Sequence, residues 1–276
     1  MVDDRTGDER RQSRGGAGSG PRGPQRQGKR PRPPLRSGPD RARRAQPEQD
    51  TEASASQRGP MLPPDIEARQ LSPEIRGELS TLDRATADAV ARHLVAAGEL
   101  LDDDPEAALG HARAARARSG RIAAVREAVG IAAYRCGDWA QALAELRAAR
   151  RMGSKSPLLA LIADCERGLD RPERALELAR GADAAQLSGD ASDELRIVVA
   201  GARTDLGQLD QALIVLSTPQ LDPARTGPTA ARLFYAYAET LLALHRGAEA
   251  LQWFLHAAAA DDEGVTDAED RIGELG

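Results

Sequence analysis

The sequence predicts an all-α protein built from helix pairs that repeat along the chain. Three observations support this prediction. Alanine accounts for 52 of the 276 residues, and it is both the best helix former and small enough to let helices approach closely. Apolar residues recur at helical spacing from about residue 63 to residue 260, without a convincing period-two stretch typical of a strand. Finally, Ala-Leu pairs recur at intervals of 33 to 38 residues.

The first 60 residues differ in character from the rest of the chain. They hold 14 Lys and Arg against 8 Asp and Glu, a net charge of +6, whereas residues 61–276 hold 24 against 35, a net charge of −11. They also contain 9 glycines, 8 prolines and no aromatic residue. Such a segment buries too little apolar surface to offset the entropy lost on ordering. We therefore expect a disordered tail over residues 1–60.

The next segment, residues 61–88, is expected to form an N-terminal capping helix region. Ser72 followed by Pro73 indicates a helix N-cap with proline at the first helical position. Leu71, Ile75 and Leu79 follow at positions that can cover the apolar end of a helical array.

Residues 89–260 are expected to form five helix-turn-helix pairs. In each pair, the alanine of the Ala-Leu motif lies on the second helix, and a small residue 12 positions earlier faces it from the first helix. Helices pack closely only where the residues at the contact are small, so these positions are predicted to fix the packing. They include Ala108, Gly130, Ala142, Ala175, Ala212 and Ala250. Gly137 and Gly207 are expected to end first helices, where glycine adopts a left-handed conformation at little cost.

This pattern resembles the tetratricopeptide repeat family, whose period is 34 residues. The unit that begins at Ala123 matches best, because Gly130, Gly137, Trp139 and Ala142 stand at its characteristic small, glycine and aromatic positions. The resemblance covers residues 89–260 and implies a right-handed superhelical solenoid of about five repeats.

Two prolines depart from the family pattern. Pro172 replaces the aromatic residue of the third unit, and Pro219 replaces a small residue of the fourth, whose second helix should therefore end early. Residues 261–276 are acidic and are expected to form a C-terminal cap or tail. Thr266 and Glu269 match a capping box at the start of a short helix there.

The resemblance also implies that the first helices line a concave face that binds a peptide or a helix. The candidate binding residues on that face are Glu127, Tyr134, Arg135, Asp164, Arg167, Arg232, Tyr235 and Glu239. Relatives that clamp a terminal carboxylate use Lys, Asn and Arg at fixed positions, which here hold Ala, Glu, Ile and Asp, so no such clamp is expected. Tyr235 remains open as an anchor or a core residue, whereas Phe234 is expected in the core.

No motif indicates catalysis, and we expect neither a cofactor nor a metal site. The four histidines are scattered, and Cys136 and Cys165 show no zinc-binding spacing, so buried free thiols are expected. The longest apolar run expected to be ordered, Leu158–Ala163, is six residues long, whereas a membrane span needs roughly 20. No secretory signal is visible at the N-terminus, and a cytoplasmic location is expected.

The basic tail allows two interpretations. In the first, it has no binding role and is a solubilising leader or the result of a start codon placed too early. In the second, it attaches electrostatically to nucleic acid or a ribosome through phosphate contacts. The candidate contacts are Arg22, Arg26, Lys29, Arg30, Arg32, Arg36, Arg41, Arg43 and Arg44. The leading hypothesis is a non-catalytic scaffold that binds a protein partner without membrane contact. Nucleic-acid or ribosome association is the alternative, and the oligomeric state is left open.

Overall fold

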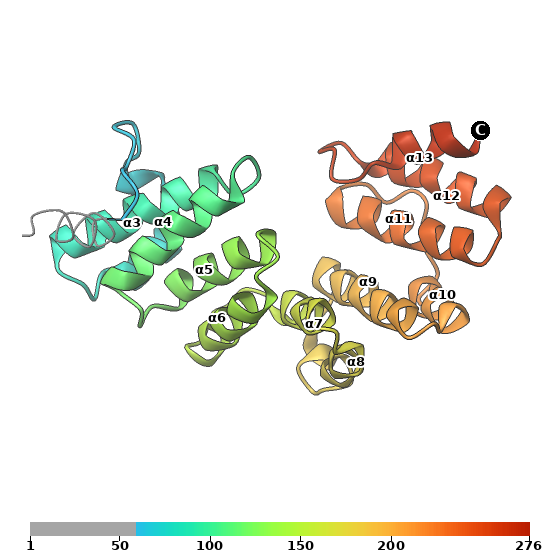
Figure 1. The fold of residues 1–276 in the computed structure, drawn as a ribbon, viewed down its shortest axis with the longest axis horizontal. Helices are drawn as coiled ribbons and strands as arrows, with labels where there is room; N and C mark the ends of the chain where they lie inside the picture. The colour runs from blue at the N-terminus through green and yellow to red at the C-terminus, as the bar shows by residue number, and fades with distance from the viewer. Residues whose placement is uncertain (1–58) are drawn as a thin grey trace, which may run out of the picture. The chain divides into compact units, whose positions relative to one another are not determined.

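The computed structural model describes residues 59–276, which lie within one compact unit. These residues contain twelve α-helices, two short 3-10 helices and no strand (Figure 1). In chain order they are η1 (Ala68–Gln70), α2 (Pro73–Leu79), α3 (Arg84–Glu99), α4 (Pro105–Arg118), α5 (Ala123–Arg135), α6 (Trp139–Arg151), α7 (Leu159–Gly168), α8 (Pro172–Ala179), η2 (Ala184–Gln186), α9 (Asp190–Asp205), α10 (Leu209–Ser217), α11 (Pro228–Ala243), α12 (Gly247–Ala260) and α13 (Ala268–Leu275). Residues 1–58, which hold nearly all of the predicted tail, lie outside the described residues.

Helices α3 to α12 form five consecutive pairs, each joined by a short turn. Within each pair the two helices pack together, and the second helix also packs against the first helix of the next pair. The predicted all-α array of tetratricopeptide-like helix pairs is therefore confirmed. None of the helices between residues 59 and 276 combines the length and apolar character needed to cross a membrane.

The predicted packing residues lie at the helix contacts. Each of the five repeated alanines, from Ala108 to Ala250, is fully buried. A methyl group at Gly130 would lie 2.7 Å from the side chain of Leu146, so α5 approaches α6 where glycine leaves room. Gly137 has a positive φ of 72° at the end of α5, and the equivalent turn after α7 places Asp170 at 57°.

Both proline departures alter a second helix. Pro172 is the first residue of α8, which has only eight residues, and α10 ends at Ser217, two residues before Pro219. The early end of α10 agrees with the sequence prediction.

The first helices of neighbouring pairs pack against one another unevenly. Helices α3 and α5 are in contact, as are α7 with α9 and α9 with α11, but α5 and α7 do not pack closely along their lengths. The stack is thus least continuous between the second and third pairs.

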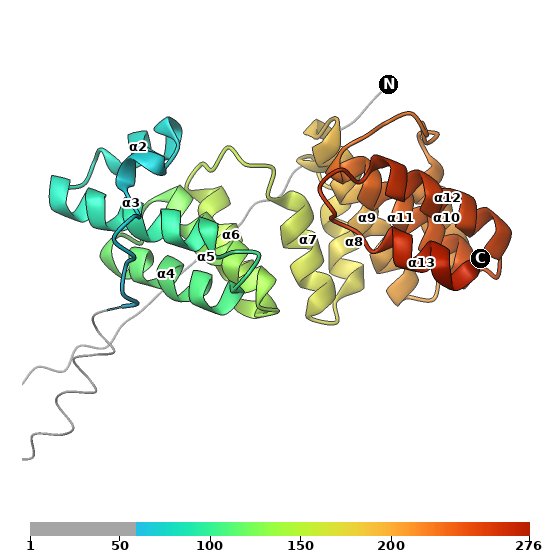
Figure 2. The same ribbon diagram turned by 90° about the horizontal axis from the view of Figure 1, so that it is seen from above.

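Additional helices cover both ends of the array. Ser72 caps α2 by accepting a hydrogen bond from the Ile75 backbone N–H, and Leu79 is buried against α3, which lies beside α2 in Figure 2. At the other end, α13 packs against α12 and begins at Ala268.

The predicted capping box of Thr266 and Glu269 is wrong, because α13 starts after Asp267 without a side-chain cap. The Thr266 hydroxyl instead donates to Asp261 at 2.7 Å, and the backbone N–H groups of Val265 and Thr266 donate to the same carboxylate. These bonds close the loop before α13 and hold Thr266 in it, one residue before the N-cap residue Asp267.

Candidate functional site

Several predicted binding residues join α5, α7 and α9 to one another. The Tyr134 hydroxyl donates to Asp164 Oδ2 at 2.6 Å and so links α5 to α7. Burial, reinforced by the Asp164 carboxylate, raises the pKa of Tyr134, which keeps the hydroxyl protonated as a donor. Arg167 on α7 donates to Asp164 at 2.7 Å and to Asp205 on α9 at 2.8 Å. These side chains therefore hold neighbouring pairs in register.

Four other candidates make similar links. Arg135 pairs with Asp102 of the preceding turn, and Arg232 pairs with Glu194 on α9. The Glu127 carboxylate accepts hydrogen bonds from the hydroxyls of Ser154 and Ser156 at 2.7 and 2.6 Å, and Glu239 accepts one from Arg271 at 2.8 Å. Seven of the eight predicted side chains thus bond to a neighbouring segment, and most of their polar atoms already have partners within the chain.

Tyr235, the eighth candidate, packs edge-on against Phe254 with ring centroids 5.3 Å apart. Burial raises its pKa, and a hydrogen bond to Asp267 adds to the shift. Phe234 is fully buried, as predicted. Tyr235 therefore contributes to the packing of the last pair and the C-terminal cap.

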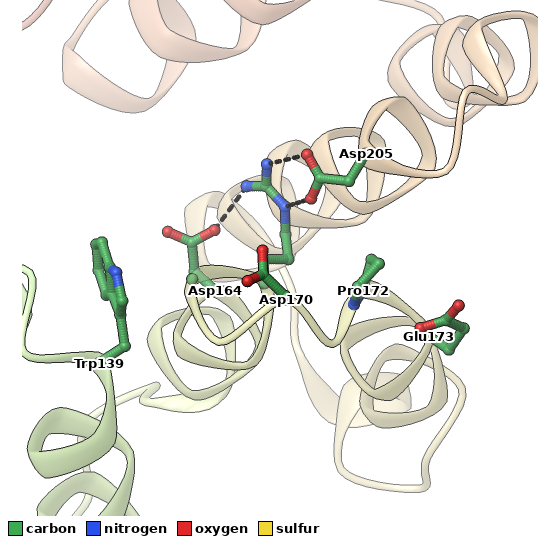
Figure 3. Close-up of a pocket in the computed structure, with 8 residues that line it drawn as sticks. Trp139, Asp164, Asp170, Pro172, Glu173 and Asp205 are labelled. Atoms are coloured by element: carbon green, nitrogen blue, oxygen red, sulfur yellow. Dashed lines mark hydrogen bonds and ion pairs between the residues drawn. The ribbon is translucent and has the colours of Figure 1, made fainter.

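A polar groove of about 630 Å³ opens near the junction of the second and third pairs (Figure 3). We call it the Trp139 groove. It is lined by residues of α6, α7, α8 and α9 and of the turn between α7 and α8, namely Trp139, Asp164, Arg167, Gly168, Asp170, Pro172, Glu173 and Asp205.

Trp139 is held firmly at one side of this groove. It is the first residue of α6, whose N-terminus Asp138 caps by accepting the Gln141 backbone N–H at 3.1 Å. Its indole lies so close to α7 that a methyl group at Gly168 would be 2.5 Å from the ring. The Tyr134 ring packs against it edge-on at 5.2 Å. The half-buried indole is therefore fixed in place where it lines the groove.

The charges of the Trp139 groove are unequal. Four carboxylates line it against the single guanidinium of Arg167. Although burial opposes the shift, hydrogen bonds to Asp205 and Asp164 raise the pKa of Arg167, and the dashed lines in Figure 3 reach both carboxylates. Asp170 and Glu173 form no ion pair with any residue between 59 and 276. The groove thus keeps two carboxylates available for a ligand.

A second groove, of about 780 Å³, has both apolar and polar side chains in its lining. We call it the Ile131 groove. Its walls come from α2, one face of α5 and the segment after α6, and its apolar side chains are Ile75, Ile122, Ala123, Ala124, Ala128, Ile131 and Met152. Glu78 accepts the Ala124 backbone N–H at 3.1 Å and so holds α2 against the start of α5. Met152 is 43% exposed. Such a groove can receive apolar side chains of a ligand.

The histidines and cysteines show no arrangement for metal binding. Between residues 59 and 276, no group of three or more His, Cys, Asp or Glu could hold an ion. His93 and His111 form a buried pair with their Nδ1 atoms 3.0 Å apart. Burial, with the charges of Arg118, His111 and Arg92, lowers the pKa of His93 to about 4.

Both cysteines are free. Burial raises the pKa of Cys165 to about 12, and it also raises the pKa of Cys136. Both thiols therefore stay protonated near neutral pH. The nine basic candidates for nucleic-acid contact, Arg22 to Arg44, lie outside the described residues.

Three of the residues that line the two grooves are predicted from the sequence as binding residues, namely Asp164, Arg167 and Glu127. Trp139 is predicted only as the aromatic residue of the repeat, and Asp170, Glu173 and Met152 are not predicted as binding residues. One signal was present: Asp170 stands in a turn position where the second and fourth pairs carry glycine.

The fold defines a helical-repeat protein with tetratricopeptide-like pairs. No family model matches the chain, and no curated protein matches it. Among solved structures, it is similar to the crystal structure of YrrB, described as a TPR protein with an unusual peptide-binding site. The similarity covers 68% of this chain and 93% of that one, at 20% identity and a TM-score of 0.41.

Proposed function

We propose that this protein is a cytoplasmic, non-catalytic scaffold that binds a segment of a partner protein, either a peptide or a helix. The observation that carries the proposal is the Ile131 groove, a concavity of about 780 Å³ in which Met152 is exposed and Ala128 and Ile131 of α5 are partly exposed. Covering apolar surface of this kind with a partner lowers the free energy of the complex. The mixed polar rim would then fix the orientation of the bound segment.

The ion pairs of the first helices support a binding role by a different argument. Arg167 and Tyr134 link successive first helices by side-chain bonds, so the surface is ordered before a partner arrives. A preformed surface loses less conformational entropy on binding. The alternative role, nucleic-acid or ribosome association, depends on Arg22 to Arg44, and nothing in residues 59–276 favours it.

The test compares two methionines in the full-length chain. Met152→Asp places a charge in the Ile131 groove, whereas Met61→Asp changes a residue that is 91% exposed and outside both grooves. Tagged wild-type and variant chains are expressed in the native cell, partners are recovered by affinity purification, and circular dichroism checks that each variant is folded.

We expect a reproducible partner with the wild type and with Met61→Asp, and recovery reduced about tenfold with Met152→Asp, the effect of losing one buried contact in an interface. Equal recovery with Met152→Asp, or no reproducible partner with the wild type, would contradict the proposal.

A further inference from the structure

We propose that the Trp139 groove receives an arginine side chain of the bound segment. The inference rests on the proposed scaffold function and adds the chemistry of the partner: a basic segment with a guanidinium at this site. Three features of the groove support it: the charges of its lining, the fixed indole and the guanidinium that the groove already holds.

The charge of the groove selects a cation. Asp164, Asp170, Glu173 and Asp205 face the groove with Arg167 as the only positive side chain in its lining. An anionic ligand would be repelled, and a neutral apolar one would cover carboxylates without giving them hydrogen bonds, which costs free energy. A cationic group meets neither penalty.

Arg167 shows how the groove binds a guanidinium. Its nitrogens donate to Asp164 at 2.7 Å and to both oxygens of Asp205 at 2.8 and 3.2 Å. Asp170 and Glu173 offer the same kind of acceptor, and they have no such partner among residues 59–276. Charge-assisted, two-pronged bonds of this kind favour arginine over lysine, whose ammonium is a compact point charge.

Trp139 supplies the second contact. A cation over an indole is attracted by the ring, most strongly for tryptophan among aromatic residues, and a planar guanidinium can stack on it. Because Gly168 and Tyr134 hold the ring in position, binding need not immobilise it. The groove therefore combines an aromatic wall with free carboxylates, the two groups that recognise arginine.

The experiment uses Trp139 as its own reporter. The chain has two tryptophans, so the full-length Trp253→Phe variant leaves Trp139 as the only tryptophan, whose emission is selected by exciting beyond the absorption of tyrosine. It is titrated with an acetylated, amidated Gly-Arg-Gly peptide and with the same peptide carrying citrulline, the neutral isostere of arginine. We expect a saturable change in emission with the arginine peptide and binding at least about tenfold weaker with the citrulline peptide.

Paired variants then locate the site. In the same background, the double change Asp170→Asn and Glu173→Gln is expected to weaken binding of the arginine peptide about tenfold. Asp210→Asn, which removes an exposed carboxylate from the equivalent first turn of α10, should leave binding unchanged. Equal binding of the two peptides, no saturable response, or equal weakening by Asp210→Asn would overturn the inference.

These outcomes are separate from those that test the scaffold. If Met152→Asp abolishes partner recovery but the arginine peptide does not bind, the scaffold stands and the inference about the Trp139 groove fails. If the peptide binds but no partner is recovered from cells, the groove has the stated chemistry and the scaffold proposal fails.

Discussion

Gly130→Ala gives a sharp test of the helix packing, because two opposing effects can be weighed from the structure. The added methyl group would lie 2.7 Å from Cγ and Cδ2 of Leu146 and 3.1 Å from its backbone N. Replacing glycine with alanine in a helix interior stabilises the helix by about 1 kcal/mol. Overpacking a filled core costs about 1–3 kcal/mol. Since Leu146 is fully buried and its backbone cannot rotate away, we expect the upper part of that range and a net loss of about 1–2 kcal/mol.

Gly110→Ala is the matched control. Gly110 also lies within a helix, α4, but a methyl group there would be 3.9 Å from its nearest neighbour, Pro60 Cγ, which is ordinary contact. Only the gain in helix propensity remains, so this variant should be stabilised by about 0.5–1 kcal/mol. Urea unfolding of the full-length variants, followed by circular dichroism, measures both changes. If Gly130→Ala were as stable as Gly110→Ala, the close approach of α5 and α6 at this position would be wrong.

Three further predictions concern other buried groups. His93 is protonated near pH 6.5 in the unfolded chain, whereas folding lowers its pKa to about 4. The free energy of unfolding should therefore fall by about 2 kcal/mol from pH 7 to pH 5. Equal urea midpoints at the two pH values would contradict this expectation. Arg147→Met should cost about 1–3 kcal/mol, because it removes the charge-assisted bond of 2.6 Å to the buried Glu166 and leaves only Arg171, 3.6 Å away, beside that carboxylate. Adding Glu166→Met should restore most of the loss in the same denaturation assay. Ala142→Trp should destabilise the fully buried contact between α5 and α6 by several kcal/mol, and an unchanged melting temperature would refute the repeat register.

The fold was predictable because the packing of helix pairs depends on local, periodic residues. Gly130 and Ala142 mark the contact between α5 and α6, and the same spacing recurs in every pair. The Thr266 capping box failed because α13 begins one residue later than the motif requires, with Asp267 at the N-cap position. The Asp261 carboxylate holds the preceding loop by accepting the Thr266 hydroxyl and two backbone N–H groups, and the motif from Thr266 to Glu269 does not include this acceptor.

The candidate site was less predictable, because its chemistry depends on which side chains remain unpaired. The sequence placed Arg167 and Asp164 on the first-helix face, but Arg167 also engages Asp205, 38 residues along the chain. Asp170 lies in the turn before α8 and Glu173 in the first turn of that helix, and neither has such a partner among the described residues. The availability of a charge is a property of the assembled neighbours.

The Trp139 groove can be traced to one departure from the repeat. Trp139 stands three residues before Ala142 and covers Gly168 of the next pair. In the third pair Pro172 stands three residues before Ala175, and Asp205 of the following pair is the counterpart of Gly168. A large side chain at position 172 would therefore cover Asp205. Proline leaves Asp205 open to the groove. Pro172→Trp should therefore fill the space and abolish binding of the arginine peptide, which is measured by calorimetry because the variant adds a fluorophore. Undiminished binding would mean that the groove does not owe its opening to this proline.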